Sequence, residues 1–559
     1  MTDLELITQP CKQILIKLEC IDRATNKVCE LQGRLLDSSL NIDSSSDIRR
    51  TISLVAHLTR EVDGYFASRL TEVWLNQMFI LSLGVLDKQT GLYRWFPLGR
   101  FLLTNDNYLY DATNQQVTIS AADLMVSLIE ERGSQVGSEV VIKADSNMQD
   151  VMEQTANRFF PWVQQSKTWG QIKDSHAYWG ENQQSWTQLK YGSDQKSICD
   201  FKGNVVPYDL EFEQTAYPYD FTKKIVNLWP CYEQYIDVYG VYTVKEIPTG
   251  LDDEPVLLAE DVDQLVISDS GSCSPKSIKN TTEIWGKEID ADYTAESCDG
   301  VSSPGIYELF FDSSYEVLED GFFFTFTPDV DSILGQKIQI QDTQAYSVGK
   351  MDANSVFTSL GKKGLKAGIQ YAIKYTNHQF VLQGESKIHV MCLEYNAHPG
   401  IEAMEQLKID HGCENIKIII NRYSSFSVEK VGILKQVLKD GDYDNIYTTE
   451  LAYERASLEN WNSTRAQENV VLSMIYVPWL DVNQKITYKS IITGNIDDYL
   501  VKRIVVSLVD FTMEITLTKF YPYYPWLRKT TTWGNIKGNN RAWKELRNFY
   551  WDEILYPVN

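Results

Sequence analysis

The chain has 559 residues, of which 43% are hydrophobic and 23% charged, with 76 acidic against 52 basic side chains and a formal net charge of −24. This length exceeds what one hydrophobic core supports and predicts about three or four domains. Proteins that grip DNA or anionic membranes gain affinity from Lys and Arg, so the acidic balance argues against both as partners. Acidity suits a surface that DNA must pass without sticking, and it equally suits a large protein that stays soluble.

The start of the chain and its cysteines indicate where it is made. The segment MTDLELITQP has neither a basic nor an apolar region, so we expect no signal peptide. The longest apolar run, residues 470–480, is shorter than the ~20 residues that a membrane helix needs. No CxxC pair occurs, so free buried thiols in a reducing cytoplasm are expected. The nine cysteines are Cys11, Cys20, Cys29, Cys199, Cys231, Cys273, Cys298, Cys392 and Cys413.

Closely spaced strands dominate the first 128 residues. Aromatic residues make up 12% of the chain, with 32 Tyr, which favours β-structure and protein interfaces. Strands are expected at residues 14–20, 51–58, 79–86, 93–98, 98–104 and 116–121. A Ser- and Asp-rich loop is expected at 41–46, and a hairpin loop at 87–91 that ends in Gly91. This series of short, closely spaced strands predicts a small antiparallel barrel or sandwich.

An α/β unit is expected over residues 129–250. Ser146 and Gln149 have the spacing of a capping box. The apolar side chains that follow share one helical face: Met148, Val151, Met152, Thr155, Ala156 and Phe159. A second helix is expected at 219–228, and residues 232–244 predict two strands around Gly240.

The remaining chain alternates between acidic, mixed and strand-rich stretches. Residues 250–300 are acidic and rich in Ser, with one strand expected at 283–285. In the mixed region 301–465, strands are expected at 322–326, 338–340, 388–393 and 416–420, and a helix at 401–407. Long strands are expected at 471–477, 485–492, 501–509 and 513–520. The tail after residue 520 carries Trp526, Trp533, Trp543 and Trp551.

Two polar features in the first domain invite a structural interpretation. Arg49 and Arg50 follow Asp43 and Asp47 and precede a strand. Their guanidinium groups can tie a loop to carboxylates within the barrel or on a neighbouring chain, or they can be a solvated pair that protects an edge strand. Asp123 follows a strand and is expected to cap a helix at 124–131 rather than to act in catalysis.

Two clusters resemble metal sites without matching one. His389, Cys392, His398, His411 and Cys413 lie within 25 positions, but His389 and Cys392 would face opposite sides of a strand, so buried thiols and ordinary imidazoles are favoured over zinc. Asp440, Asp442 and Asp444 have calcium-loop spacing. Asn445 replaces the usual Gly, Leu451 stands at the twelfth position and Glu450 comes one place early, so a solvated acidic turn is favoured.

Aromatic residues crowd the stretch 159–186. They are Phe159, Phe160, Trp162, Trp169, Tyr178, Trp179 and Trp186. Burial in the α/β unit is the favoured interpretation, ahead of contact with a partner protein or stacking on sugar rings.

Motifs of common enzymes are absent from the sequence. There is no HExxH, no GxSxG and no Walker loop, and the stretch GKKGLKAG from Gly361 has the wrong spacing for phosphate binding. We therefore assign no catalytic, cofactor-binding or metal-binding residues and expect no cofactor.

Five sequence segments, called phrases below, together carry a resemblance to a known family. They are GRLLDSSLNIDSSSDIRRTISL from Gly33; WFPLGRFLLT from Trp95 with YDATN and VTISAADLM; YDLEF from Tyr208 through IDVYGVY; KSIKNTTEIWG from Lys276; and PWLDVNQKITY from Pro478 through the strands that end at FYP. In this order the chain resembles the baseplate-hub and tail-associated (tail tip) proteins of phages that infect Gram-positive bacteria. The resemblance spans roughly residues 10–290 and 470–525.

The resemblance implies a fold that is mainly β with α+β elements: two tube-like antiparallel β-barrel domains per chain in a ring of three chains. The expected segments are 1–128, the first barrel; 129–250, an α/β domain; 251–300, a linker and the first strands of the second barrel; 301–465, an inserted mixed domain; 466–525, the rest of the second barrel; and 526–559, a Trp-rich arm. The insert matches nothing in the family pattern. We expect no long C-terminal extension with fibres or hydrolases of the kind that many tail-associated relatives carry, which puts wall digestion in doubt.

The expected function is therefore that of a non-enzymatic structural hub in a virion tail, assembled in the host cytoplasm. A homotrimer would adapt the sixfold tail tube to a threefold tip and line the DNA exit channel without binding DNA specifically. Its expected partners are the tail tube, distal tail or baseplate, tape-measure and possibly spike or fibre proteins. The alternatives are a tail-associated cell-wall-degrading enzyme, with a carboxylate pair in an aromatic cleft, and a receptor- or carbohydrate-binding tail module.

Overall fold

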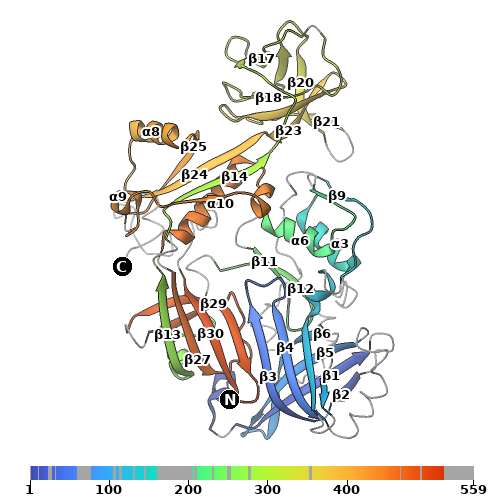
Figure 1. The fold of residues 1–559 in the computed structure, drawn as a ribbon, viewed down its shortest axis with the longest axis vertical. Coiled ribbons are helices and arrows are strands. Elements are labelled where there is room, and N and C mark those ends of the chain that lie inside the picture. The colour runs from blue at the N-terminus through green and yellow to red at the C-terminus, as the bar shows by residue number, and fades with distance from the viewer. Residues whose placement is uncertain are drawn as a thin grey trace.

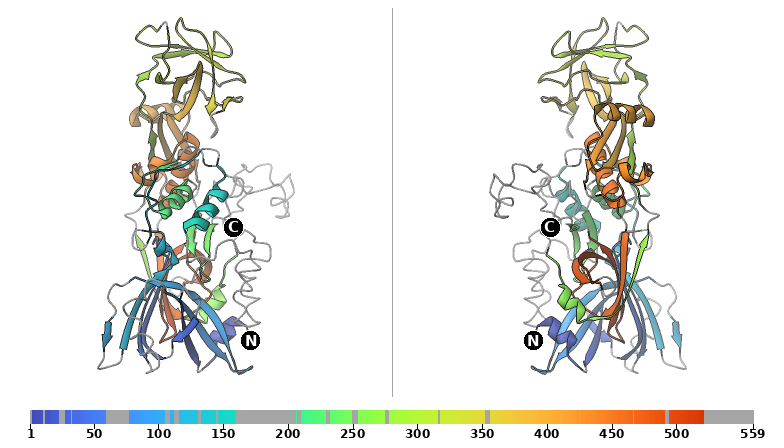
Figure 2. Two further views of the ribbon diagram at one scale, coloured as in Figure 1. Left: turned by 90° about the vertical axis from the view of Figure 1, so that its right-hand side faces the viewer. Right: turned by 90° about the vertical axis from the view of Figure 1, so that its left-hand side faces the viewer.

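The structure is a computed structural model. It describes residues 2–10, 12–22, 28–31, 33–58, 77–104, 109–111, 116–129, 133–143, 146–159, 206, 210–228, 232–248, 254–274, 278–315, 317–351, 356–422, 424–465, 467–490 and 494–520. The described part is elongated, with one large sheet at one end, a separate β unit at the other, and helices with small sheets between them (Figures 1 and 2). None of the helices in these ranges is long and apolar enough to cross a membrane.

Strands from both ends of the chain form one antiparallel sheet of 13 strands. In pairing order they are β13 (Val266–Ser274), β27 (Gln467–Ile475), β30 (Thr512–Lys519), β29 (Ile496–Ser507), β3 (Gly33–Asp43), β4 (Arg50–Leu58), β8 (Gln116–Asp123), β6 (Leu92–Leu103), β5 (Gln77–Asp87), β1 (Ile14–Asp22) and β2 (Val28–Leu31), with β28 (Lys485–Lys489) on β29 and β7 (Leu109–Asp111) on β8. The N-terminal and C-terminal strands join at β3 and β29, where Leu40 lies opposite Val506 and Asp43 opposite Arg503. Figure 2 shows the strands spread apart toward the lower end.

This large sheet curls around one hydrophobic core. Buried side chains of β3, β4, β5 and β6 belong to the same cluster as those of β27, β29 and β30. Leu6 and Ile7 of α1 (Asp3–Thr8) and Val262 of α7 (Ala259–Asp263) complete it. The two sets of strands thus share a sheet and a core within one chain. That each set closes into a tube-like barrel stays a prediction.

The middle layer packs against the back of β5 and β6. It contains η2 (Leu124–Ser127), β9 (Val140–Ile142), α3 (Met148–Phe159), β10 (Leu210–Phe212), α6 (Pro218–Asn227), β11 (Tyr232–Ile236) and β12 (Tyr242–Glu246). Met152, Phe221 and Ile225 cluster there with Ile80 and Leu102 of the large sheet.

Above it lies a four-stranded sheet with helices. Its order is β25 (Asn415–Ile420), β24 (Lys387–Tyr395), β14 (Thr281–Glu288) and β26 (Lys435–Leu438), and its helices are α8 (Ile401–His411), α9 (Val428–Val431), η5 (Gly441–Asn445) and α10 (Thr449–Ser463). Ala452 and Ala456 of α10 pack on Ile284 and Val390 of the sheet. This unit therefore buries one sheet face under α10.

A nine-stranded β unit stands at the far end (Figure 1). Its strands are β15 (Tyr293–Thr294), β16 (Ser297–Asp299), β17 (Ile306–Phe310), β18 (Phe323–Phe326), β19 (Lys337–Ile340), β20 (Tyr346–Met351), β21 (Phe357–Ser359), β22 (Tyr371–Thr376) and β23 (Gln379–Glu385). Unlike the large sheet it includes parallel pairs, such as β17 with β19. All of its strands come from one continuous stretch of chain.

Most expected elements are confirmed, and the errors have local reasons. The hairpin over 87–91 joins β5 and β6, but 93–98 and 98–104 are one strand, bent where Leu81 pairs with Gly99 and Ser82 with Pro97. The loop expected at 41–46 begins only after Asp43. The Ser146–Gln149 capping box is wrong, because Asn147 Oδ1 accepts the Asp150 N–H at 3.2 Å.

Among the elements that the sequence did not predict, two bear on the architecture. α10 has no counterpart among the predicted helices, and β13 falls in a Ser-rich stretch where only residues 283–285 were expected as a strand. β13 joins the large sheet, whereas β14 pairs with β24 and β26. The division of the chain into six segments otherwise stays a prediction.

Candidate functional site

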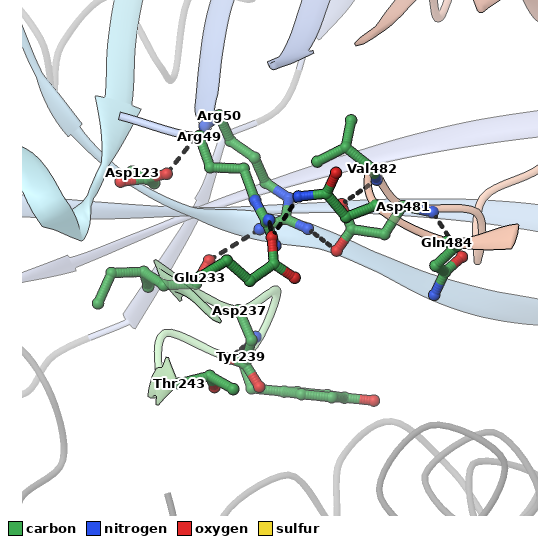
Figure 3. A network of polar contacts seen from close by, with 12 residues as sticks. Arg49, Arg50, Asp123, Glu233, Asp237, Tyr239, Thr243, Asp481, Val482 and Gln484 are labelled. Carbon is green, nitrogen blue, oxygen red and sulfur yellow. Dashed lines mark hydrogen bonds and ion pairs between the residues drawn. The ribbon is translucent and has the colours of Figure 1, made fainter. Parts of the chain in front are cut away.

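Arg49 and Arg50 lie where the turn after β3 ends and β4 begins. They are at the centre of a buried network of charges (Figure 3). Both side chains are buried, and β4 lies between β3 and β8. The interpretation of Arg49 and Arg50 as a solvated pair that protects an edge strand is therefore wrong. The expectation that the pair ties elements to carboxylates is confirmed, and these carboxylates lie within the same chain.

Arg50 holds three elements together. Its Nη2 pairs with Asp481 Oδ2, and its Nη1 donates to the carbonyl of Ile236 at 2.8 Å. Its backbone N–H donates to Asp123 Oδ2 at 2.8 Å. The β3–β4 turn, the end of β11 and the loop before β28 therefore converge on one guanidinium, whose planar fork suits such multiple bonding.

Arg49 also connects the β3–β4 turn to β11. Its Nη2 pairs with Glu233 Oε2, and its guanidinium lies 3.7 Å from the ring centroid of Tyr235. Glu233 also accepts from Asn483 Nδ2 at 2.6 Å and lies 3.4 Å from Lys245 Nζ. Burial alone would lower the pKa of Arg49, but Glu233 and Asp481 outweigh it and raise that pKa above its ordinary value.

Two turns with defined hydrogen bonds, at Asp481 and at Asp237, border the network. Asp481 Oδ1 accepts the N–H of Val482 at 2.9 Å, and its own N–H donates to Gln484 Oε1 at 2.9 Å. Asp237 Oδ1 closes the β11–β12 hairpin by accepting from Tyr239 and Val241, each at 2.8 Å. Gly240 has φ +78°, and a Cβ there would come within 2.7 Å of Arg100 Cδ, so only glycine fits.

Asp123 caps η2, as the sequence predicts. Its Oδ1 accepts the Met125 N–H at 3.0 Å, although the helix is a short 3₁₀ turn and not the segment 124–131. Burial raises the pKa of Asp123 to about 6, against the opposing effect of the N–H groups of Arg50 and Met125. Its role here is to fix the backbone at Arg50 and Met125.

The network has the features of a structural connection between the large sheet and the middle layer, called the joint below, and not those of a reaction centre. The cavity beside Arg50, lined by Pro97, Val238 and Trp479, has a volume of about 10 Å³, which is room for about one water molecule. Each carboxylate is already engaged by an arginine or a backbone N–H. Sequence reasoning identified the arginines and Asp123. It missed Glu233 and Asp481, because an isolated acid in an apolar strand or loop carries no local signal.

The cysteine and histidine cluster is divided between two sides of β24. His389 Nε2 bonds to Glu283 Oε1 at 2.7 Å and its ring stacks on Trp285 at 3.7 Å, while burial lowers its pKa. Cys392 faces α10, 3.7 Å from Ser457 Oγ, so the expectation of opposite faces is confirmed. Burial raises the pKa of both Cys392 and Cys413 to about 11.

The other candidate residues stay apart. His398 Nδ1 accepts the Gly400 N–H at 3.1 Å, and His411 ends α8. Asp440 precedes η5, and both Asp440 and Asp444 are exposed. Within the described ranges, no three His, Cys, Asp or Glu side chains are placed to hold a metal ion. Phe159 ends α3, and the aromatic residues from 160 to 186 lie outside the described residues.

Comparison with known proteins gives a partial match. A family model described as a domain of unknown function (DUF5048) matches residues 423–524. No curated protein matches the chain.

Similar solved structures include several tail proteins. The 43 kDa tail protein of prophage MuSo2 from Shewanella oneidensis is 9% identical with a TM-score of 0.40, covering 91% of this chain and 99% of that one. A tail protein from Neisseria meningitidis is 7% identical with a TM-score of 0.39, covering 90% and 96%. The prophage tail protein gp18 from Listeria monocytogenes is 10% identical with a TM-score of 0.36, covering 90% and 94%.

Proposed function

We propose that this chain is a structural subunit of the tail of a phage or phage-like particle, a trimeric hub at the tail tip or baseplate. The five phrases that carry the sequence resemblance support this role. Four of them fall on the network: the first contains Arg49 and Arg50, the second Asp123, the third Asp237, and the fifth Asp481. The residues that make the chain resemble hub proteins are thus the ones that join its parts.

The observation that carries the proposal is the open edge of the large sheet. β13 lies at the end of the pairing order, and among the described strands it pairs only with β27. Its sequence VISDSGSCS contains no Lys, Arg or Pro, the residues that usually protect a free edge. Asp269, its one charge, accepts from Tyr488 OH at 2.7 Å. An edge of this kind suits coverage by another chain.

The buried joint suits a part that transmits force between tube and tip. Arg49 connects the sheet to the middle layer through its desolvated ion pair with Glu233, and Arg50 does so through its bond to the carbonyl of Ile236. A desolvated ion pair is strongly destabilised when it loses one partner. The net charge of −24 suits a channel that DNA passes without sticking. Association with tube, distal tail, tape-measure or spike proteins, and a host among Gram-positive bacteria, belong to the same proposal.

Localisation in the particle tests this function. Tails from the source strain are labelled with an antibody against the purified chain and viewed by electron microscopy. Label at the end of the tail distal to the head is the expected result. Label on the head or along the whole tube, or chain found only outside particles, would contradict the proposal.

Charge placed on the open edge tests the assembly itself. Ile267 on β13 is 61% exposed, so Ile267→Lys is expected to leave the single chain folded and to raise the concentration at which copies assemble at least tenfold. Ile496 on β29 is 60% exposed and provides the matched control Ile496→Lys. Equal assembly of the two variants would exclude β13 from the interface.

One observation favours a receptor-binding role in addition. Tyr293 in the nine-stranded unit is 44% exposed, and its ring stacks on Phe322 at 4.7 Å. A supported, half-open ring is a surface on which a sugar or a partner can stack. Retention of the full chain on purified cell walls, lost on Tyr293→Ala, is the expected result of that role. Walls that retain neither protein would exclude it.

A further inference from the structure

An open pocket of about 440 Å³ lies between the N-terminal segment and the turn of β29 and β30. Gln9, Lys12 and Ile14 form one wall, and Ile475, Asp510 and Phe511 form the other. The volume falls in the range of ligand sites and is far larger than the cavity beside Arg50. No residue of the charge network lines it.

Gln9 brings an unused hydrogen-bond acceptor to this pocket. Its side chain is 7% exposed, and its Nε2 donates to the carbonyl of Leu86 at 2.7 Å. Its Oε1 is buried and accepts no hydrogen bond from the described residues. A buried polar atom without a partner costs free energy, so this position favours an incoming N–H or O–H donor.

Lys12 brings a positive charge that has no counter-ion among the residues that the structure describes. Its Nζ lies 5.0 Å from the ring centroid of Phe511, and no carboxylate of the described residues is within ion-pair distance. Burial lowers the pKa of Lys12. Asp510, which also lines the pocket, accepts instead from Ser507 Oγ at 2.8 Å. The ammonium is thus available to an anion from outside.

Phe511 gives the pocket a fixed wall. Its backbone has φ +55°, which is unusual for a residue with a Cβ. Its carbonyl accepts the Tyr476 N–H at 3.1 Å, and its ring meets Tyr476 edge-on at 5.9 Å. The position of Phe511 in this wall is therefore set by its two contacts with Tyr476.

We propose that this pocket binds an acidic segment of a second copy of this chain, with a carboxylate on Lys12 and a main-chain N–H on Gln9 Oε1. A peptide supplies both groups, and its neighbouring apolar side chain contacts Ile14 and Ile475. The chain carries 76 acidic groups against 52 basic ones, so a second copy offers many carboxylates to the ammonium of Lys12. The inference rests on the proposed self-assembly and names one of its contacts.

Chemical footprinting of Lys12 tests the inference on the unmodified chain. An amine-reactive ester is applied below and above the concentration at which copies assemble, and acylation of Lys12 is measured by mass spectrometry against exposed Lys350 on β20. We expect at least tenfold protection of Lys12 on assembly and none of Lys350. An assembled particle in which Lys12 reacts as fast as in the dilute chain would overturn the inference and leave the proposed function intact.

A peptide and a variant identify the occupant. If N-acetyl-Gly-Asp-amide protects Lys12 in the dilute chain while assembly does not, the pocket serves another protein and the second copy is rejected as occupant. Gln9→Leu removes the acceptor and is expected to raise the assembly concentration several-fold, whereas Lys350→Gln is expected to leave it unchanged. Equal assembly of both variants would contradict the role given to Gln9.

Discussion

The large sheet and the nine-stranded unit are both β-structures, but they are assembled from the chain in opposite ways. The large sheet joins residues near 40 to residues near 505 at β3 and β29, and the buried ion pair of Arg49 with Glu233 fixes it to the middle layer. The nine-stranded unit uses one continuous stretch and an apolar, aromatic core around Phe324 and Phe380. Distant segments need directional bonds to fix their placement, whereas the continuous chain already brings the strands of a local unit together around its core.

The largest loss is expected from breaking the joint at Arg50. Arg50→Met leaves the carboxylate of Asp481 buried without its partner, which costs about 3–5 kcal/mol of unfolding free energy. Denaturant unfolding followed by the near-ultraviolet signal measures it. The double variant Arg50→Met/Asp481→Leu is the control and should recover part of the loss. A single variant that costs under about 1 kcal/mol would show that the joint is not rigid.

A comparable loss that stays local is expected in the nine-stranded unit. Leu309 in β17 is fully buried, so Leu309→Ala removes apolar contacts and costs about 2–5 kcal/mol. Hydrogen exchange should speed up in β17 and β19 and remain unchanged in β3 and β29. Faster exchange throughout the large sheet would mean that the two regions unfold as one.

A smaller effect is expected from the pH dependence of Asp123. Its pKa of about 6 lies above that of an unfolded Asp, so the folded chain binds the extra proton between about pH 4 and 6. Stability from this group is therefore present at low pH and is lost as pH rises through 6, by at most ~1.4 kcal/mol per pH unit. Asp123→Asn should remove that slope. Identical slopes in both proteins would refute it.

The smallest effect on the isolated chain is expected at the open edge. Ile267→Lys should change the unfolding free energy by less than about 0.5 kcal/mol, because the side chain is already exposed. Its consequence should appear only in assembly. A large loss in the dilute chain would mean that β13 is stabilised within one copy, and the edge would then need no partner.

Local patterns in the sequence predicted local structure well. The alternating residues of β1 and β4, the hairpin at Gly91, helix α6 and the cap by Asp123 all depend on neighbours within a few positions. The sequence did not predict β13, because its Ser-rich stretch has little apolar alternation. Its strand form comes from pairing with β27, about 200 positions away. The sequence did not identify Glu233 and Asp481 as network residues, because only the fold brings them to Arg49 and Arg50.

The mass of the purified chain in solution tests the central proposal most directly. Native mass spectrometry or sedimentation equilibrium at micromolar concentration should give three times the 64.2 kDa of one chain, and Ile267→Lys should shift the population toward the single chain. A protein that remains a single chain at every concentration, with and without other tail proteins, would contradict the trimeric hub.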